Sequence, residues 1–344
     1  MPRFLLEKLS MKKRTVFYAV LLAICATFIA CSKDFESNAP YKDVTIVYGI
    51  LNSDDDTHYI KIYKGFLTTG DAYNVAQEYD SLYYFDKIKV EVEEYVNNTK
   101  TNTFTLDTTT SIPREAGDFA SPKQLLYTFT YPLRDDAMYL LRITNKETGR
   151  EVTAQTLLVR SFRINSPNVT QLDIRNATPN NPIKFSDAGN AAAYDVYQYF
   201  YYIERDKTTL QETEKYVKRK INSSILTATS MNYVPASIFT AISSNVKPNS
   251  NVERYLKSDS CIKFEVWGVN DELLKYVQVN TPSSSVVLDR LHYTNIKTDD
   301  NLTAGILGSR KKVESWYQIN QISQDSLVYG SQTRNLGFHY FYQR

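Results

Sequence analysis

Apolar and polar residues alternate along much of this chain, most plainly in residues 86–96 (DKIKVEVEEYV). Ile88, Val90 and Val92 fall on one side of an extended backbone, and the charged residues between them fall on the other. A period of two predicts a β-strand with one buried face. The same pattern occurs before residue 160 in further segments: 44–51, 59–66, 102–106, 125–131, 139–144 and 152–159.

The last two of these strands form a predicted hairpin that indicates the fold. Residues 137–145 and 151–159 flank the turn NKETG, in which Gly149 can adopt a positive φ. Just before the hairpin, Leu133 and Tyr139 have the spacing found at the tyrosine corner of immunoglobulin-like and fibronectin type III domains. We therefore predict that residues 41–160 form such a β-sandwich, in which the Tyr139 hydroxyl binds a backbone group.

The pattern changes after residue 160. Residues 161–189 are rich in Pro, Asn and Ser, which predicts a domain junction. Residues 194–204 and 215–221 then predict a long antiparallel pair, and residues 262–266 predict a strand with a buried face. The fold class is therefore mostly β, with residues 190–344 as a second β-rich domain with short helices. Its other expected elements are helices over 235–244 and 271–277 and strands near 285–288, 304–307, 314–319 and 336–341.

The N-terminal segment has the pattern of an export signal. Residues 11–14 (MKKR) are cationic, and residues 16–30 are an apolar run. A secretory signal has this order, and the run is shorter than the roughly 20 residues that a membrane-spanning helix needs. We predict a signal peptide over residues 1–30, with Met11 as the true start.

The sequence Phe28-Ile29-Ala30-Cys31 resembles the bacterial lipobox, although Phe28 stands where Leu is usual. The resemblance implies cleavage before Cys31 and the attachment of diacylglycerol and palmitate to it, with residues 31–40 as a lipidated tether. Two or three acyl chains anchor a protein stably, whereas one binds only marginally. The alternative is an ordinary signal peptide in which Cys31 is incidental.

The residues after the cysteine indicate a location. Ser32 is followed by Asp34 and Glu36, which resembles the surface-export signal of Bacteroidota lipoproteins. This resemblance implies a bacterial outer-membrane lipoprotein that is exposed on the cell surface.

Removal of the leader changes the charge. The whole chain has a net charge of +2, but residues 1–30 hold five basic residues and one acidic residue, so the mature chain has a net charge of −2. No concentrated basic face is left to bind nucleic acid. The one basic cluster, residues 215–220 (KYVKRK), alternates with apolar residues and predicts the wet face of a strand. With Cys31 acylated, Cys261 has no partner for an intramolecular disulfide.

The sequence contains no recognisable catalytic or metal-binding motif. His58, His292 and His339 are isolated, with no metal-ligand spacing to cysteine or to one another. Residues 52–56 (NSDDD) resemble the start of a calcium loop, but Thr57 stands where the turning glycine should be. We therefore predict a solvated turn there, no metal, no cofactor and no enzymatic activity, although paired carboxylates distant in sequence stay open as a hydrolase alternative.

Two aromatic clusters are candidate ligand contacts. Residues 83–85 (YYF) and 197–202 (YQYFYY) could offer flat rings for stacking on sugars. The alternative, which we favour, is that aromatic residues are simply common in strands. The same interpretation applies to Trp267 and Trp316, which occur singly in strand-like segments.

Three triplets resemble the O-glycosylation signal of Bacteroidota: Asp80-Ser81-Leu82, Asp107-Thr108-Thr109 and Asp325-Ser326-Leu327. Ser81, Thr108 and Ser326 would be the acceptors. Such triplets are common by chance, so they matter only as a group consistent with export.

The order of these segments resembles a family of Bacteroidota lipoproteins known only as a domain of unknown function. The resemblance rests on the lipobox, residues 44–51 (VTIVYGIL), the hairpin ending at 152–154 (VTA), and residues 293–296 (YTNI) with 305–308 (GILG). Members of that family often accompany TonB-dependent outer-membrane receptors.

The resemblance implies a non-enzymatic accessory of such a receptor, working in nutrient capture or envelope function with a glycan or a peptide as its ligand. The alternatives are a fimbrillin-like structural or adhesion subunit, since those proteins also join a lipoprotein leader to two β-sandwiches, and a carbohydrate-binding protein.

Overall fold

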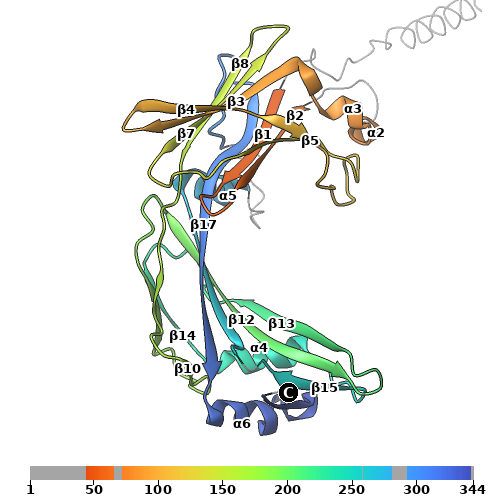
Figure 1. The fold of residues 1–344 in the computed structure, drawn as a ribbon, viewed down its shortest axis with the longest axis vertical. Coiled ribbons are helices and arrows are strands. Elements are labelled where there is room, and N and C mark those ends of the chain that lie inside the picture. Colours follow the sequence, from red (N-terminus) through yellow and green to blue (C-terminus); the bar gives the residue numbers. More distant parts are fainter. Residues whose placement is uncertain (1–43, 66–71, 258, 281–292, 342–344) are drawn as a thin grey trace, which may run out of the picture.

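The computed structural model describes residues 44–65, 72–257, 259–280 and 293–341, and it is mostly β, as the sequence predicts. This part of the chain forms an N-terminal lobe and a C-terminal lobe, which are the two arms of a C joined by one long strand (Figure 1). None of the helices in these ranges is long and apolar enough to cross a membrane.

The N-terminal lobe is a β-sandwich, and all the strands predicted before residue 160 are present in it. Its two sheets pack through apolar side chains such as Val47, Ile62, Val92 and Leu141. In sheet order, one layer consists of β1 (Val44–Leu51), β2 (Thr57–Gly65), β6 (Leu126–Thr130) and β5 (Asp107–Thr109), which form one end of a larger sheet that continues into the other lobe. The other consists of β4 (Thr99–Thr105), β3 (Ile88–Val96), β7 (Met138–Asn145) and β8 (Glu151–Leu157).

The predicted hairpin and tyrosine corner are both confirmed. Strands β7 and β8 pair antiparallel, and Gly149 in their turn has a φ of 72°. The Tyr139 hydroxyl accepts a hydrogen bond from the Arg134 backbone N–H at 2.8 Å and donates one to the buried Glu94 carboxylate at 2.8 Å. The corner therefore ties the chain entering β7 to strand β3 of the same sheet.

The helices are short. Helices α4 (Ser237–Asn245) and α5 (Asp271–Asn280) confirm the helices expected over 235–244 and 271–277. Helix α6 (Gln321–Tyr329) is not predicted by the sequence, because its buried side includes the polar residues Ser323 and Gln324. The remaining short elements are α2 (Ala72–Ala76), α3 (Tyr79–Leu82) and the 3-10 turns η1 (Phe85–Lys87) and η2 (Arg334–Leu336).

The C-terminal lobe is built on a second large group of strands. In sheet order these are β18 (Phe338–Phe341), β15 (Val252–Leu256), β12 (Ala193–Asp206), β16 (Ile262–Val269) and β17 (Thr303–Ile319), and β13 (Glu212–Lys220) also pairs with β12. A three-stranded sheet of β14 (Ser230–Tyr233), β11 (Asn181–Phe185) and β9 (Ile164–Ser166) covers one face through a core that includes Ile183, Phe185, Phe200 and Phe264. The opposite face lies on the inner side of the C (Figure 1).

The segment expected to be a junction contributes to this core. Residues 161–189 contain β9, β11 and the short β10 (Gln171–Leu172), and Ile174 in the same segment is fully buried. These strands are too short for an alternating pattern to emerge from the surrounding Pro and Asn residues. The strand expected near 285–288 lies outside the described residues.

One strand, β17, belongs to both lobes. Its first part pairs parallel with β1, from Thr45 beside Thr303 to Leu51 beside Ser309, and the next eight residues pair antiparallel with β16. The sequence predicts two separate strands here, both in the second domain. The polar stretch 308–312 (GSRKK) hides their continuity, because the strand passes there between two cores and not along one.

A buried polar network fills this passage between the lobes. Asn270 is 1% exposed, and its side-chain oxygen accepts hydrogen bonds from the backbone N–H groups of Ser309 at 3.1 Å and Leu273 at 3.2 Å. Its amide nitrogen donates to Thr156 in β8 at 2.8 Å. Asn270 thus caps α5 and joins the end of β16 to the N-terminal sandwich.

The parallel pairing of β1 and β17 depends on Gly305, whose φ is 97° and whose hypothetical Cβ would lie 1.8 Å from the Val47 carbonyl oxygen. We expect Gly305→Ala to lower the free energy of unfolding by at least about 2 kcal/mol, because the backbone strain adds to the clash between the two strands. Urea denaturation of the purified variant measures this change.

Gly117→Ala is the matched control, since a Cβ at Gly117 meets nothing within 4 Å. It should leave the unfolding free energy within about 0.5 kcal/mol of the parent value. Equal changes in the two variants would contradict a role for Gly305 in joining β1 to β17.

Candidate functional site

The candidate site lies on the inner face of the C-terminal lobe, where β12 turns every second residue toward the hollow of the C. Phe200 and Tyr202 point into the core, so Tyr197, Tyr199 and Tyr201 point the other way. The cluster 197–202 that the sequence singles out is therefore divided: its even-numbered positions pack the core, and its tyrosines at odd positions belong to the inner face.

Glu265 of β16 organises this face. It is 4% exposed, and one of its oxygens accepts hydrogen bonds from the Trp267 indole N–H at 2.7 Å and the Tyr199 hydroxyl at 3.0 Å. Its other oxygen accepts from the Lys263 ammonium at 3.1 Å. Burial alone raises the pKa of this carboxyl, but the hydrogen bonds outweigh burial and hold the pKa below its ordinary value.

Lys263 in turn lies among aromatic rings. Its ammonium nitrogen is 4.1 Å from the centre of the Tyr199 ring, 5.4 Å from that of Trp316 and 5.7 Å from that of Tyr201. The Tyr201 and Trp316 rings have centres 5.0 Å apart. We call Tyr197, Tyr199, Tyr201, Trp267 and Trp316 the aromatic strip. Its rings are fixed by ionic hydrogen bonds and cation–π contacts.

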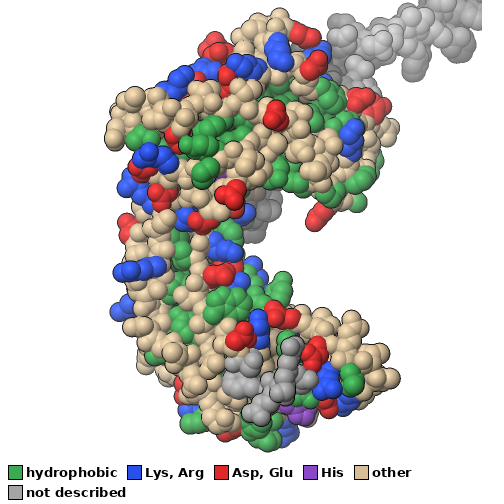
Figure 2. Space-filling model, viewed as in Figure 1, with side chains coloured by type: hydrophobic (Ala, Val, Ile, Leu, Met, Phe, Trp, Pro, Cys, Tyr) green, Lys and Arg blue, Asp and Glu red, His purple; other side chains and the backbone are tan. Residues whose placement is uncertain are grey.

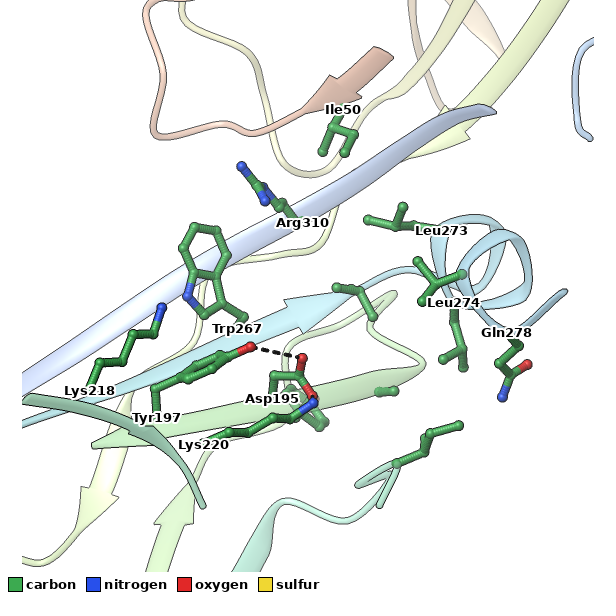
Figure 3. Close-up of a pocket in the computed structure, with 15 residues that line it drawn as sticks. Ile50, Asp195, Tyr197, Lys218, Lys220, Trp267, Leu273, Leu274, Gln278 and Arg310 are labelled. Atoms are coloured by element: carbon green, nitrogen blue, oxygen red, sulfur yellow. Dashed lines mark hydrogen bonds and ion pairs between the residues drawn. The ribbon is translucent and has the colours of Figure 1, made fainter. Parts of the chain in front are cut away.

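A pocket of about 770 Å³ opens at the end of the strip that is nearer the N-terminal lobe (Figure 3). Trp267 and Tyr197 form one side of it, and Leu273 and Leu274 of α5 form another. Val277 of the same helix also lines the pocket. Ile50 of β1, from the N-terminal lobe, and Ile225 complete the apolar lining.

Several apolar side chains of the pocket are unusually accessible for their type. Ile50 is 40% exposed, and Ile225 and Val277 are each 52% exposed. Hydrophobic, basic and acidic side chains gather together on this hollowed side of the molecule in Figure 2. Grouped apolar exposure of this kind marks an interaction site more often than scattered single residues do.

The pocket is also lined by charged side chains, with more basic than acidic groups. Asp195 forms an ion pair with Lys220 at 2.6 Å. The Arg310 guanidinium carbon lies 4.7 Å from the centre of the Trp267 ring, and the Lys218 nitrogen lies 4.2 Å from that of Tyr197. The pocket therefore has three cationic side chains and one carboxylate.

Sequence reasoning found the tyrosines and tryptophans of this site but not its charged residues. Glu265, Lys218 and Arg310 look like solvent-facing positions of ordinary strands, and residues 215–220 do form a largely exposed strand face. A usable signal was the segment 263–267 (KFEVW), in which Lys263, Glu265 and Trp267 share one side of the strand.

The residues of the lipobox, Phe28, Ile29, Ala30 and Cys31, lie outside the described residues, as does the whole predicted signal peptide. Their roles stay predictions.

The three glycosylation candidates occupy different settings. Thr108 is exposed in β5. Ser81 is half-buried, and its hydroxyl donates to the Val75 and Glu78 carbonyl oxygens at 2.6 and 2.7 Å. Ser326, also half-buried, donates to the Ile322 carbonyl at 2.9 Å within α6. Of the three hydroxyls, that of Thr108 lies on the most accessible residue.

The remaining candidate groups have structural surroundings. His58 is buried with its Nε2 atom 3.0 Å from the Tyr131 carbonyl oxygen, and burial lowers its pKa. His339 stacks on Tyr255, and His292 lies outside the described residues. Within the described ranges, no group of three or more His, Cys, Asp or Glu side chains is arranged to hold a metal ion.

The other sequence candidates are also accounted for. In the turn 52–56, the Asp54 carboxylate pairs with Lys311 of β17 at 2.5 Å. Tyr83 and Tyr84 are buried in the N-terminal core, so their rings are not accessible for stacking on a sugar. Cys261 is buried, and burial raises the pKa of its thiol to about 12.

Comparison of this chain with protein-family models and with curated proteins found no match.

We expect Glu265→Gln to lower the free energy of unfolding by about 2 kcal/mol, because the amide has no charge and only one acceptor oxygen for Trp267, Tyr199 and Lys263. Glu314→Gln is the matched control: Glu314 is the β17 partner of Glu265, but its side chain is 38% exposed. Its loss should change stability by less than about 0.5 kcal/mol. Urea denaturation of both variants measures the difference, and similar losses would contradict the central position of Glu265.

The comparison of the parent with Glu265→Gln also predicts a pH dependence. The folded-state pKa of Glu265 lies below the ordinary value of 4.5, so its carboxylate contributes stability that is present above that value and is lost as the pH falls through the folded-state pKa. The stability difference between the parent and Glu265→Gln should therefore be constant from about pH 7 to pH 5 and shrink below about pH 4. A difference that stays unchanged at about pH 3 would refute this assignment.

Proposed function

We propose that this chain is a non-enzymatic binding protein that is exported and held at the outer membrane by acyl chains on Cys31, with its two lobes on the cell surface. In this proposal it serves a TonB-dependent receptor as an accessory that captures a nutrient. The observation that carries the proposal is the pocket between α5 and the aromatic strip, on the inner side of the C.

The composition of the pocket supports binding. Small-molecule sites are mostly apolar concavities with a few polar groups at fixed positions, and this pocket combines aliphatic and aromatic walls with Asp195, Lys218, Lys220 and Arg310. Two carboxylates at this site serve the scaffold: Asp195 pairs with Lys220, and Glu265 holds Trp267 and Tyr199. A role in positioning rings favours binding over acid–base chemistry.

The placement of the pocket supports a surface role. It draws Ile50 from the N-terminal lobe and its other walls from α5 and the C-terminal strands. A ligand there touches both lobes at once, so its presence can be reported to a partner through either arm of the C. The lipid anchor would supply the proximity to a membrane receptor, since two or more acyl chains hold a protein stably at a bilayer.

The anchor is tested by Cys31→Ser. We expect this change to abolish palmitate incorporation and to release the protein from the membrane fraction, because no other residue of the lipobox can carry the acyl chains. Cys25→Ser is the matched control and should leave both measurements unchanged. Palmitate labelling that persists in Cys31→Ser would contradict the proposed anchor.

The receptor is tested by crosslinking the native protein in intact outer membranes, followed by affinity purification and mass spectrometry. We expect a TonB-dependent receptor among the crosslinked partners of the parent chain, and its absence from those of Cys31→Ser. Recovery of the lipidated parent with no such receptor would overturn the accessory role.

A further inference from the structure

Two cations beside the pocket lack an acidic partner. The Arg310 guanidinium and the Lys218 ammonium each lie over a ring, those of Trp267 and Tyr197. Within the described ranges, no carboxylate lies within ion-pair distance of either group, whereas neighbouring Lys220 has Asp195. The pocket thus presents two uncompensated positive charges at one side.

The opposite side of the pocket is aliphatic. Leu273 and Leu274 of α5 lie on this side in Figure 3, and Val277, Ile50 and Ile225 also line the pocket. Leu273 is already buried, but the exposed surface of Ile50, Ile225 and Val277 is withdrawn from water only when an apolar group fills the pocket, which contributes roughly 25 cal/mol per Å² of apolar area. The rings of Trp267 and Tyr197 add flat surfaces between the aliphatic and the cationic sides.

We propose that the pocket binds an amphipathic organic anion: a molecule with an apolar, partly planar body and one carboxylate, sulfate or phosphate group. The body lies against α5, Ile50 and the Trp267 ring, and the anionic group lies on the side of the pocket that carries Arg310 and Lys218. This assignment names the ligand class for the binding function proposed above and rests on that function only for its biological role.

The chemistry of the walls distinguishes this ligand from the two classes that the sequence suggests. A neutral glycan needs many hydrogen-bonding side chains around its hydroxyls, but most of this lining is aliphatic or aromatic. An extended peptide usually pairs with the free edge of a sheet, whereas the part of the pocket around Trp267 lies on a sheet face whose backbone groups are already paired between β12, β16 and β17. The volume of about 770 Å³ is in the range of small-molecule sites.

A matched pair of fluorescent probes tests the proposal. Anilinonaphthalene sulfonate and phenylnaphthylamine share one planar apolar body, and only the first carries an anionic group. The full chain is used with Cys31→Ser, so that no acyl chain competes for the probes. We expect saturable binding of the sulfonate to one site, at least about tenfold tighter than binding of the neutral probe, since a charge-assisted contact is roughly twice as strong as a neutral one.

Substitution of the two cations locates the charge. Lys218→Gln combined with Arg310→Gln should weaken sulfonate binding at least about tenfold and change binding of the neutral probe by less than about twofold. Lys184→Gln is the matched control, because Lys184 is exposed on β11, in the sheet that covers the opposite face. It should leave the affinity for both probes unchanged.

Energy transfer locates the body of the probe. The chain has two tryptophans, so Trp316→Phe in all samples leaves Trp267 as the only tryptophan, and bound sulfonate should quench its emission under excitation selective for tryptophan. Equal affinity for the two probes, no effect of the double substitution, or saturable binding without quenching of Trp267 would each overturn the proposal. These outcomes are independent of the crosslinking result, so failure of the ligand class and failure of the receptor role are distinguishable.

Discussion

The backbone pairing of β17 is the constraint on which the rest of the structure depends. A single strand pairs with β1 along its first seven residues and with β16 along the next eight, so the two lobes share a continuous ladder of hydrogen bonds. The passage between the lobes is polar and buried, and each polar group needs a partner there. Asn270 meets this need for both sides: it accepts from Ser309 of β17 and donates to Thr156 of β8. Main-chain pairing and the Asn270 side chain therefore both fix the relative position of the lobes, together with contacts such as the Lys311–Asp54 ion pair.

The inner face of the C-terminal lobe follows from the same arrangement. The three-stranded sheet of β9, β11 and β14 covers only one side of β12 and β16. On the other side, the part of β17 that pairs with the N-terminal sandwich ends at Ser309, before the strand reaches β16, and no layer of this chain's described residues lies over the aromatic strip. In place of a second covering layer, contacts within the strip stabilise this face. Glu265 accepts hydrogen bonds from Tyr199 and Trp267, and Lys263 lies against the Trp316 ring. A half-covered sheet thereby acquires a rigid, partly apolar surface.

Much of this architecture is visible in the sequence, and the missing parts have identifiable causes. Alternation predicts the strands of the sandwich other than the three-residue β5, because a sandwich strand has one solvent-facing and one buried side. Leu133 with Tyr139 predicts the corner that Arg134 completes. The continuity of β17 is not predicted because its middle, Gly308 to Lys312, contributes no apolar side chain to either core. Strands β9 to β11 escape because they are short and lie between prolines and asparagines. The burial of Glu265 is not predicted for a different reason. Large side chains on the adjacent strands cover it, and only the register of β12, β16 and β17 brings those side chains together.

The hydrogen bonds of Glu265 bear on the entropy of recognition. A flexible side chain that becomes ordered when a ligand binds loses about 0.5–1.5 kcal/mol of conformational freedom. Tyr199 and Trp267 have already lost theirs during folding, because one carboxylate fixes both rings in the protein without ligand. The surface is thus pre-organised. A ligand that contacts Trp267 does not have to order that ring, so no entropy cost for it reduces the affinity.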